Sequence, residues 1–313
     1  MNLSILAVTL CVVAYGVPPA CAHEQEPVSA YEEEFSVPEG ISPIPAARVS
    51  DLQGPAWHSM ITNIPGDWFR AGQVTFRTKS LPTLVGIALI TGALMVVDHE
   101  TYNESHTLMR NSETIHDASH VILHFGDGKA SFGLAAAFAL YGIAGDDRRA
   151  LRTASQTVEA VIASGIAVQL LKRVTGRESP QMATVRHGEW RPFPAWGTYN
   201  RHQPRYYAFP SGHMTTAIAT ITVVAENYPE VRWIRPVGYV LAALMGASLV
   251  NVGWHWYSDF PLAIAMGYSF GMIASHREDD DPMGEGGISG PAGLRILPGV
   301  NADGLGVTLA LCF

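Results

Sequence analysis

The sequence predicts an all-α protein whose body is a compact bundle of about six core helices, and two observations support this. Hydrophobic residues make up 48% of the 313 residues and charged residues only 15%, which is less charge than the quarter that soluble domains usually carry. The apolar residues also gather in separate segments rich in Ala, Gly, Ser, Thr and Leu. That composition favours helices that pack closely.

The order of apolar and polar stretches divides the chain into four regions. A signal-like leader, a polar arm, a helical domain and a glycine-rich tail occupy residues 1–22, 23–78, 79–276 and 277–313. The leader has an apolar run before Ala20-Cys21-Ala22, which is typical of an export cleavage site, although the usual basic start is missing. The sequence therefore predicts an exported protein of the periplasm or cell envelope, with association to the inner membrane left open.

The arm and the tail are expected to be less regular than the bundle. Residues 23–78 are polar and contain prolines, which favours an irregular arm. The tail closes with Gly304–Leu311, whose pattern favours a short β-hairpin or edge strand. Cleavage of the leader would leave Cys312 as the only cysteine, so neither an internal disulfide nor a cysteine zinc cluster is expected.

Six apolar segments account for the expected helices of the bundle. They cover residues 81–97, 131–144, 154–171, 213–226, 236–252 and 259–275. The first and fifth are comfortably long for a membrane span of about 20 residues, whereas Glu159 interrupts the third and Glu226 ends the fourth. An exported N-terminus and the positive-inside rule give opposite orientations for a six-span protein. The pattern therefore favours an exported bundle that does not fully cross a membrane but can rest on its surface.

Composition also narrows the expected partners. The formal net charge of −8 argues against a nucleic-acid partner, which needs a basic face. His116, His120 and His124 would share one face of a helix and could bind a divalent ion. A polar helix that covers the site is the preferred interpretation, so no metal and no cofactor are expected. The sequence does not indicate an oligomeric state.

Three polar clusters would lie at one end of the bundle if neighbouring helices alternate in direction. They centre on Lys172 and Arg177 after the third segment, Ser211-Gly212-His213 before the fourth, and His255 and Asp259 before the sixth. Cations and helix N-terminal N–H groups can hold phosphate oxygens. One histidine can then attack phosphorus while the other protonates the leaving group. The clusters therefore predict a site for phosphoryl chemistry.

Local spacing supports this interpretation and also leaves simpler roles open. Ser211 is a favourable N-cap, and Gly212 lets another group approach the backbone. His255 and Asp259 are four residues apart, so in a helical turn the carboxylate would orient one imidazole nitrogen and leave the other free to attack. Alternatively, Asp259 only caps a helix, His255 packs between two tryptophans, and Lys172 extends to solvent from a helix end.

These residues resemble the type 2 phosphatidic acid phosphatase and vanadium haloperoxidase superfamily over roughly residues 81–275. That family carries Lys-x6-Arg-Pro, then Pro-Ser-Gly-His, then Ser-Arg-x5-His-x3-Asp. The matching segments here are Lys172–Pro180, Pro210–His213 and Ser248–Asp259. Their order, spacing and placement at helix ends all agree with the family.

The resemblance implies an all-α bundle, hydrolysis without a metal ion and a phosphohistidine intermediate. It implies that His255 is the nucleophile, His213 the general acid and Asp259 the residue that orients the nucleophile. It further implies that Lys172, Ser211 and Gly212 bind the phosphate.

Two positions depart from the family pattern. Ser179 and Leu249 stand where the family has arginines that would contact the phosphate oxygens. Losing one such donor in a transition state can cost about 100-fold or more in rate. Arg177, two residues before Ser179, is expected to replace one of them as a phosphate ligand, and Arg205 and Arg201 are further candidates.

The residues and the resemblance together predict a metal-independent phosphomonoesterase of the cell envelope that hydrolyses a lipid phosphate or a small phosphate ester. The aromatic loop from Trp190 to Tyr207 is expected to line or cover the pocket and could accept an apolar tail. One alternative is a phosphate or lipid binder weakened by the loss of two arginines. Another is a vanadate-dependent haloperoxidase, which the missing arginines disfavour.

Overall fold

The structure is a computed structural model that describes residue 57 and residues 59–276, 288–289, 294–301 and 304–311. The signal-like leader, nearly all of the polar arm before residue 59, and Cys312 lie outside the described residues. Within the described part the body is entirely helical, which confirms the predicted all-α class. The tail contributes a three-stranded antiparallel sheet in the order β1-β2-β3.

The helices and strands follow one another as a single series along the chain. The α-helices are α2 (Ser59–Thr62), α3 (Ile64–Thr75), α4 (Leu81–Arg110), α5 (Glu113–Ile122), α6 (Gly128–Gly145), α7 (Arg148–Thr175), α8 (Trp196–Arg201), α9 (Gly212–Asn227), α10 (Ile234–Asn251) and α11 (Phe260–His276). Short 3-10 helices are η2 (Thr78–Ser80), η3 (Leu123–Gly126), η4 (Pro180–Met182), η5 (Gln203–Arg205) and η6 (Tyr257–Asp259). The strands are β1 (Ile288–Ser289), β2 (Leu294–Asn301) and β3 (Gly304–Leu311).

The six predicted segments correspond to α4, α6, α7, α9, α10 and α11. The segment Gly304–Leu311, predicted as a hairpin or an edge strand, forms the single edge strand β3, which pairs with β2 so that Gly304 lies opposite Asn301. The expectation of an irregular arm is wrong for its last part, because α3 forms there and the indole Nε1–H of Trp68 donates to the Ala163 carbonyl of α7 at 2.9 Å.

Helix α7 is longer than its apolar segment and is not interrupted by Glu159. It begins after Asp147, whose carboxylate accepts from the Ala150 N–H at 3.1 Å. Glu159 is buried, and its carboxylate accepts a hydrogen bond from the Asn63 side chain at 3.2 Å. This partner reduces the cost of burying the carboxylate, and the helix continues past it. The helix ends at Gly176, whose φ of +57° is the left-handed conformation that commonly follows a helix C-terminus.

Helix α9 lies at the centre of the bundle and packs against α7, α10 and α11. Nearly every residue of α9 after His213 is buried. This agrees with its sequence, in which apolar and small residues occupy all faces of the helix. The main core cluster is formed by α9, α10, α11 and the segments that cover them, and it includes Met214, Ile218, Met245, Leu249 and Phe260. The first turn of α9 is therefore fixed by packing on all sides except its tip.

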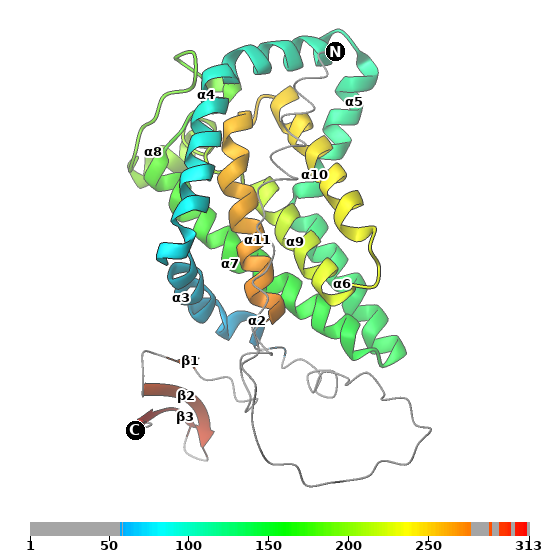
Figure 1. Ribbon diagram of the computed structural model, residues 1–313, viewed down its shortest axis with the longest axis vertical. Coiled ribbons are helices and arrows are strands. Elements are labelled where there is room, and N and C mark those ends of the chain that lie inside the picture. The colour runs from blue at the N-terminus through cyan, green and yellow to red at the C-terminus, as the bar shows by residue number, and fades with distance from the viewer. Residues whose placement is uncertain (1–56, 58, 277–287, 290–293, 302–303, 312–313) are drawn as a thin grey trace.

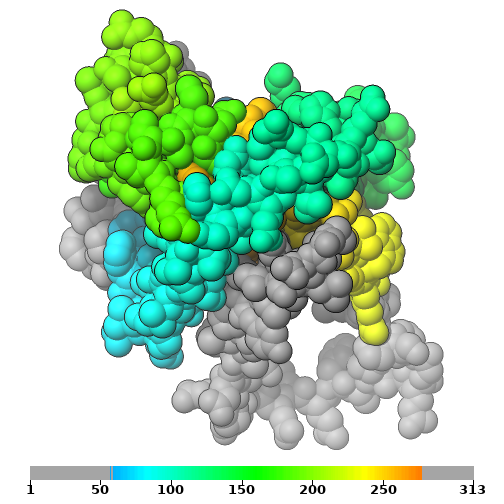
Figure 2. Space-filling model, turned by 90° about the horizontal axis from the view of Figure 1, so that it is seen from above, coloured from blue at the N-terminus to red at the C-terminus, as the bar shows by residue number. Residues whose placement is uncertain are grey.

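Several helix ends meet at one end of the bundle, which is uppermost in Figure 1. Helices α4, α7 and α10 run towards this end, and α9 and α11 begin there. Figure 2 shows this end from above, where the green connection between α7 and α9 and the teal α4–α5 region cover most of the orange segment below. The alternating directions bring together the three polar clusters, as the sequence predicted.

Three helices are long and apolar enough to cross a membrane: the segment Thr78–Arg110 that includes α4, then α7, and then α10. The first and third were expected from the sequence, whereas α7 was expected to be too short. Only 11% of the apolar window in α4 is buried, so most of its apolar side chains face outward, including Leu89 and Val96. An outward-facing apolar helix is typical of contact with lipid.

Candidate active site

His255 and Asp259 form a buried pair at the start of α11. The Nδ1 atom of His255 lies 3.3 Å from Oδ2 of Asp259, and neither side chain is exposed. Because the carboxylate accepts from Nδ1–H, the lone pair of His255 is placed on Nε2. That Nε2 atom is buried and has no hydrogen-bond partner among the described residues. The structure therefore has an oriented imidazole with one nitrogen available to attack, in the arrangement that the four-residue spacing predicted.

Asp259 also caps the turn in which it lies. Its Oδ2 accepts from the Trp256 N–H at 2.8 Å within η6, so the simpler capping role and the orienting role occur together. Its other oxygen, Oδ1, accepts from Arg177 at 2.6 Å. The Trp256 ring packs beside this group, and its Nε1–H donates to the Glu178 carbonyl at 2.8 Å. The alternative of His255 as a packing residue between tryptophans does not account for this oriented carboxylate.

His213 lies opposite His255, and the centres of the two rings are 6.2 Å apart. Its Nε2 atom is 3.0 Å from Oδ1 of Asp127, while Oδ2 of the same carboxylate lies 2.8 Å from Nδ1 of His124. Gly126 permits this arrangement, because a Cβ at that position would lie 2.8 Å from the Cβ of His213. The segment between α5 and α6 thus places a carboxylate on the second histidine.

Lys172 is a buried cation beside the first turn of α9. Its ammonium lies 4.9 Å from the centre of the Tyr207 ring, and a Cβ placed on Gly212 would be 3.8 Å from it. Among the described residues the ammonium group of Lys172 has neither a hydrogen-bond partner nor an ion-pair partner. It is therefore buried and free to bind an anion, which excludes the alternative of a lysine that extends to solvent.

The tip of α9 faces the same space as Lys172. Ser211 is the N-cap, as predicted, and its Oγ accepts from the Met214 N–H at 3.4 Å. Within the described residues the N–H groups of Gly212 and His213 have no acceptor. Unpaired N–H groups at the positive end of a helix dipole suit an anion such as phosphate.

Burial keeps both histidines neutral in the empty site. Burial, together with the neighbouring His255 and Lys172, lowers the pKa of His213 to about 4 against the opposing effect of Asp127. Burial also lowers the pKa of His255, against the opposing effect of Asp259. A neutral His255 suits a nucleophile. His213 must gain a proton to act as an acid, which a bound phosphate anion would favour.

The positions that depart from the family pattern do not supply a cation. Ser179 is buried, and its N–H and hydroxyl both donate to the Pro204 carbonyl. Leu249 lies in the apolar core, so an arginine there would bury a charge. The candidates Arg205 and Arg201 are exposed.

Arg177 is buried, as a site residue could be, but its position differs from the one expected for a phosphate ligand. Its NH1 group donates to Asp259 and Ser258, and its NH2 group donates to Asp98 at 2.8 Å. Both ends of the guanidinium are therefore already bound by protein oxygens. We accordingly no longer place Arg177 among the phosphate-binding residues.

The connection between α7 and α9 forms the expected aromatic cover. Tyr207 contacts both Lys172 and the edge of His255, whose ring centre is 6.4 Å away. The buried carboxylate of Glu178 fixes the loop by accepting from the N–H groups of Thr184 and Glu189 at 2.8 and 3.1 Å. The cover is thus held by hydrogen bonds at its base, while its outer aromatic side chains remain exposed.

Sequence reasoning missed two carboxylates of this site, Asp98 and Asp127. Asp98 directly follows the first predicted apolar segment, yet it is buried within the longer α4 and binds Arg177. A charged residue continuing an apolar helix was the available signal, since buried charges need partners. Asp127 precedes α6 at its N-cap position, and no spacing rule connects it with His213.

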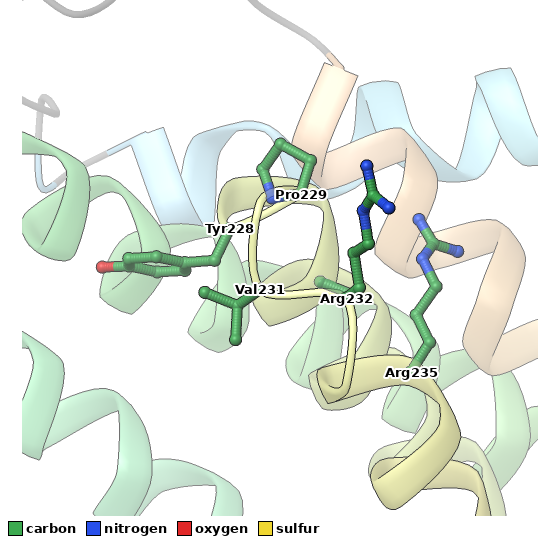
Figure 3. A pocket seen from close by; sticks show the side chains of 6 residues that line it. Tyr228, Pro229, Val231, Arg232 and Arg235 are labelled. Atoms are coloured by element: carbon green, nitrogen blue, oxygen red, sulfur yellow. The ribbon is translucent and has the colours of Figure 1, made fainter.

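Two other features lie apart from these residues. The rings of His116 and His120 on α5 lie 4.6 Å apart and are tilted by 53°. Helix α5 ends at Ile122, so His124 is not on the same helix, and no potential metal cluster is found in the described part of the chain. A cavity of about 200 Å³ lies at the α9–α10 connection, beside Arg232 and Arg235 (Figure 3). It is at the opposite end of α9, whose 16 residues span about 24 Å.

Comparison with known proteins addresses the family. The PAP2 superfamily model matches residues 153–281, which contain all three motif segments. Among solved structures, a transmembrane PAP2 type phosphatidylglycerolphosphate phosphatase from Bacillus subtilis is similar, with 15% identity and a TM-score of 0.46 over 64% of this chain and 98% of that chain. No curated protein matches. The match to the PAP2 superfamily model over residues 153–281 confirms the resemblance seen in the sequence.

Proposed function

We propose that the protein is a phosphomonoesterase of the cell envelope that hydrolyses a lipid phosphate without a metal ion. The observation that carries this proposal is a convergence of groups that have no hydrogen-bond partner within the described part of the chain. They are the ammonium of Lys172, the Nε2 atom of His255 and the first N–H groups of α9. A phosphate would supply oxygens to the first and third of these groups and a phosphorus atom to the second.

The reaction would proceed in two steps through a covalent intermediate. In the first, Nε2 of His255 attacks phosphorus, the bond from phosphorus to the ester oxygen breaks, and His213 donates a proton to the departing alcohol. In the second, water attacks phosphorus, His213 accepts the proton, and inorganic phosphate leaves with restoration of His255. Lys172 and the α9 N–H groups would stabilise the negative oxygens throughout.

Surface composition favours a lipid over a small soluble ester. The connection that covers the site exposes Trp190, Phe193 and Trp196. Exposed aromatic residues of this kind are enriched where proteins meet the membrane–water interface. Helix α4, which ends at the same side of the bundle, directs apolar side chains outward. A substrate held in the membrane could therefore place its headgroup in the site while its tail stays in lipid.

Location in the exported compartment belongs to the proposal as well. The sequence predicts a cleaved leader and no internal disulfide. The leader and all three cysteines lie outside the described residues, so both remain predictions. The three candidate spans now favour a membrane protein over the bundle resting on a surface that the sequence suggested. If these helices cross the membrane, the positive-inside rule places the basic end of the bundle, with Arg148, Arg149 and Arg232, in the cytoplasm and the site at the membrane interface on the exported side. A cleaved leader before α4 would give the opposite orientation.

The decisive test is phosphate release by the purified full chain in detergent micelles with excess EDTA. Phosphatidic acid and p-nitrophenyl phosphate serve as the lipid and the soluble substrate. We expect the wild type to release phosphate from both and to have the higher kcat/KM for the lipid. His255→Ala should lower the rate by about 1,000-fold or more, because the nucleophile is lost. His276→Ala, at the other end of α11, is the matched control and should leave the rate unchanged.

The same assay distinguishes the second candidate function. The uncharged Ser179 and Leu249 favour a phosphate binder, because the site holds fewer cations than the family pattern provides. A wild-type protein that binds inorganic phosphate by calorimetry but releases none from either substrate would support the binder and contradict the enzyme. Activity retained by His255→Ala, or activity that EDTA removes, would contradict the proposed mechanism.

A further inference from the structure

Arg177 is one of the largest fully buried side chains, and it lies behind Asp259 as seen from His255. Its guanidinium is 2.6 Å from Oδ1 of Asp259 and 2.8 Å from Oδ2 of Asp98. Ser258 links Asp98 to Arg177, because its N–H donates to Asp98 at 3.2 Å and its hydroxyl lies within hydrogen-bonding distance of both Asp98 and Arg177. The result is a continuous buried chain from Asp98 through Arg177 and Asp259 to His255.

The backbone and the surrounding rings hold this arginine in one orientation. Arg177 pairs through its main chain with Trp190 on one side and Tyr207 on the other. The guanidinium carbon lies 5.1 and 5.5 Å from the ring centres of Trp190 and Trp256. A planar fork between two rings and two carboxylates has little freedom to turn, and such contacts suit arginine rather than lysine.

We infer that Arg177 is a positioning residue, which Asp98 anchors and which fixes Asp259 so that His255 presents Nε2 to the substrate. This inference rests on the proposed function of His255 as nucleophile. Asp259 has two oxygens, and Arg177 occupies one of them while Nδ1–H of His255 and the Trp256 N–H share the other. Without the guanidinium the carboxylate could rotate, and His255 would lose the partner that sets its tautomer.

Charge explains why two carboxylates flank the arginine. An unpaired buried carboxylate or guanidinium is costly. In the series Asp98–Arg177–Asp259, each charged group faces one of opposite sign. Asp98 comes from α4, outside the segment that matches the PAP2 superfamily, whereas Arg177 and Asp259 lie within it. The pairing therefore connects the outward-facing helix α4 directly to the orientation of the proposed nucleophile.

The test separates a positioning role from phosphate binding by comparing kcat with affinity. Arg177→Lys keeps the charge but loses the fork, so we expect kcat to fall by about 10- to 100-fold, the range seen when an outer partner of a reactive group is removed. KM and the Kd of inorganic phosphate should change less than about threefold. Arg149→Gln is the matched control, because Arg149 is also bound by several oxygens but at the other end of the bundle.

A double-mutant cycle then tests the anchor. Asp98→Asn alone should lower kcat by about 10-fold, but it should have little further effect in the Arg177→Lys background, since both act on Asp259 through the same fork. Thermal unfolding of each variant shows whether it folds. Should a single variant fail to fold, the combination Asp98→Asn with Arg177→Gln removes one charge of each sign and leaves the net charge of this group unchanged.

A readout independent of turnover completes the design. In protein with ¹⁵N-labelled histidine, the His255 signal should report the Nδ1–H tautomer in wild type and a mixture of tautomers in Arg177→Lys. This result stands even if wild type hydrolyses neither substrate, so failure of the proposed function remains distinguishable. A rise of 10-fold or more in the Kd of phosphate, with an unchanged tautomer and kcat, would overturn the inference and restore Arg177 as a phosphate ligand.

Discussion

His255 and His213 face each other across the candidate active site, yet the protein surrounds them in different ways. His255 is fully buried, and a chain of paired charges extends behind it to Asp98. The side chain of His213 is 21% exposed, and its partner Asp127 is itself 28% exposed and shared with His124. One histidine is thus held from the protein interior and the other from its rim.

The difference matches the two proposed roles. A nucleophile must keep one orientation and one tautomer, which a buried chain of partners enforces. A general acid must exchange its proton with water in every cycle, and a partly exposed carboxylate beside it permits that exchange. The comparison therefore predicts that changes around His255 alter orientation, whereas changes around His213 alter proton transfer and its dependence on pH.

Replacement of His213 should have the largest effect among changes at the rim. His213→Asn should slow hydrolysis of an alkyl phosphate such as phosphatidic acid by about 100- to 10,000-fold, because its alcohol leaves only with a proton. Hydrolysis of p-nitrophenyl phosphate should slow much less, since nitrophenolate leaves without one. Steady-state rates on both substrates check this, with His276→Ala as the control. Equal losses on both substrates would contradict the assignment of His213 as the acid.

Replacement of Asp127 should have an intermediate effect and should change the pH profile. Asp127 raises the pKa of His213 against burial, so Asp127→Asn should lower that pKa below its value of about 4 in the empty site. An acid acts only when protonated, so the alkaline limb of kcat/KM should move to lower pH, with a loss of about 10-fold at neutral pH. An unchanged limb would show that Asp127 does not support the acid.

His124 provides the smallest expected effect and the control for Asp127. It bonds to the same carboxylate, but its side chain is 67% exposed, so solvent can replace it. His124→Gln should therefore change kcat/KM by less than about threefold and leave the alkaline limb in place. A shift as large as that of Asp127→Asn would mean that proton exchange runs through His124.

In the wild type, the binding of substrate should also make the pH profile of kcat differ from the pH profile of kcat/KM. A phosphate dianion beside His213 favours its protonated form and opposes the burial that lowers its pKa. The alkaline limb of kcat, which reports the enzyme–substrate complex, should then lie at higher pH than the limb of kcat/KM, which reports the free enzyme. Coinciding limbs would indicate that the substrate does not contact His213.

Much of this architecture could be predicted from the sequence because its causes are local. Apolar segments with turn residues between them gave six helices, and alternation of their directions placed Lys172, His213 and His255 at one end. Ser211 was predicted as an N-cap from its residue type, and the structure shows its Oγ accepting from the Met214 N–H. These features depend on residues close together in the chain.

The remaining features depend on contacts between distant segments. Asp98 and Asp127 reach the site from α4 and from the start of α6, and no spacing relates them to the motifs. The proximity of Arg177 to Ser179 suggested a substitute phosphate ligand, but a buried guanidinium pairs with whichever carboxylates surround it. The length of α7 was underestimated because a buried glutamate can be accommodated once a partner such as Asn63 is present.

The measurement that tests the central claim most directly is capture of the proposed intermediate. Wild-type protein would be mixed with ³²P-labelled phosphatidic acid in EDTA, quenched within milliseconds in alkaline denaturant, where phosphohistidine persists, and digested for peptide mapping. We predict label on the peptide that contains His255, and no label in His255→Ala. With ³²P-labelled p-nitrophenyl phosphate in place of the lipid, the label should increase in His213→Asn. Label at another residue, or rapid phosphate release with no labelled peptide, would contradict the account.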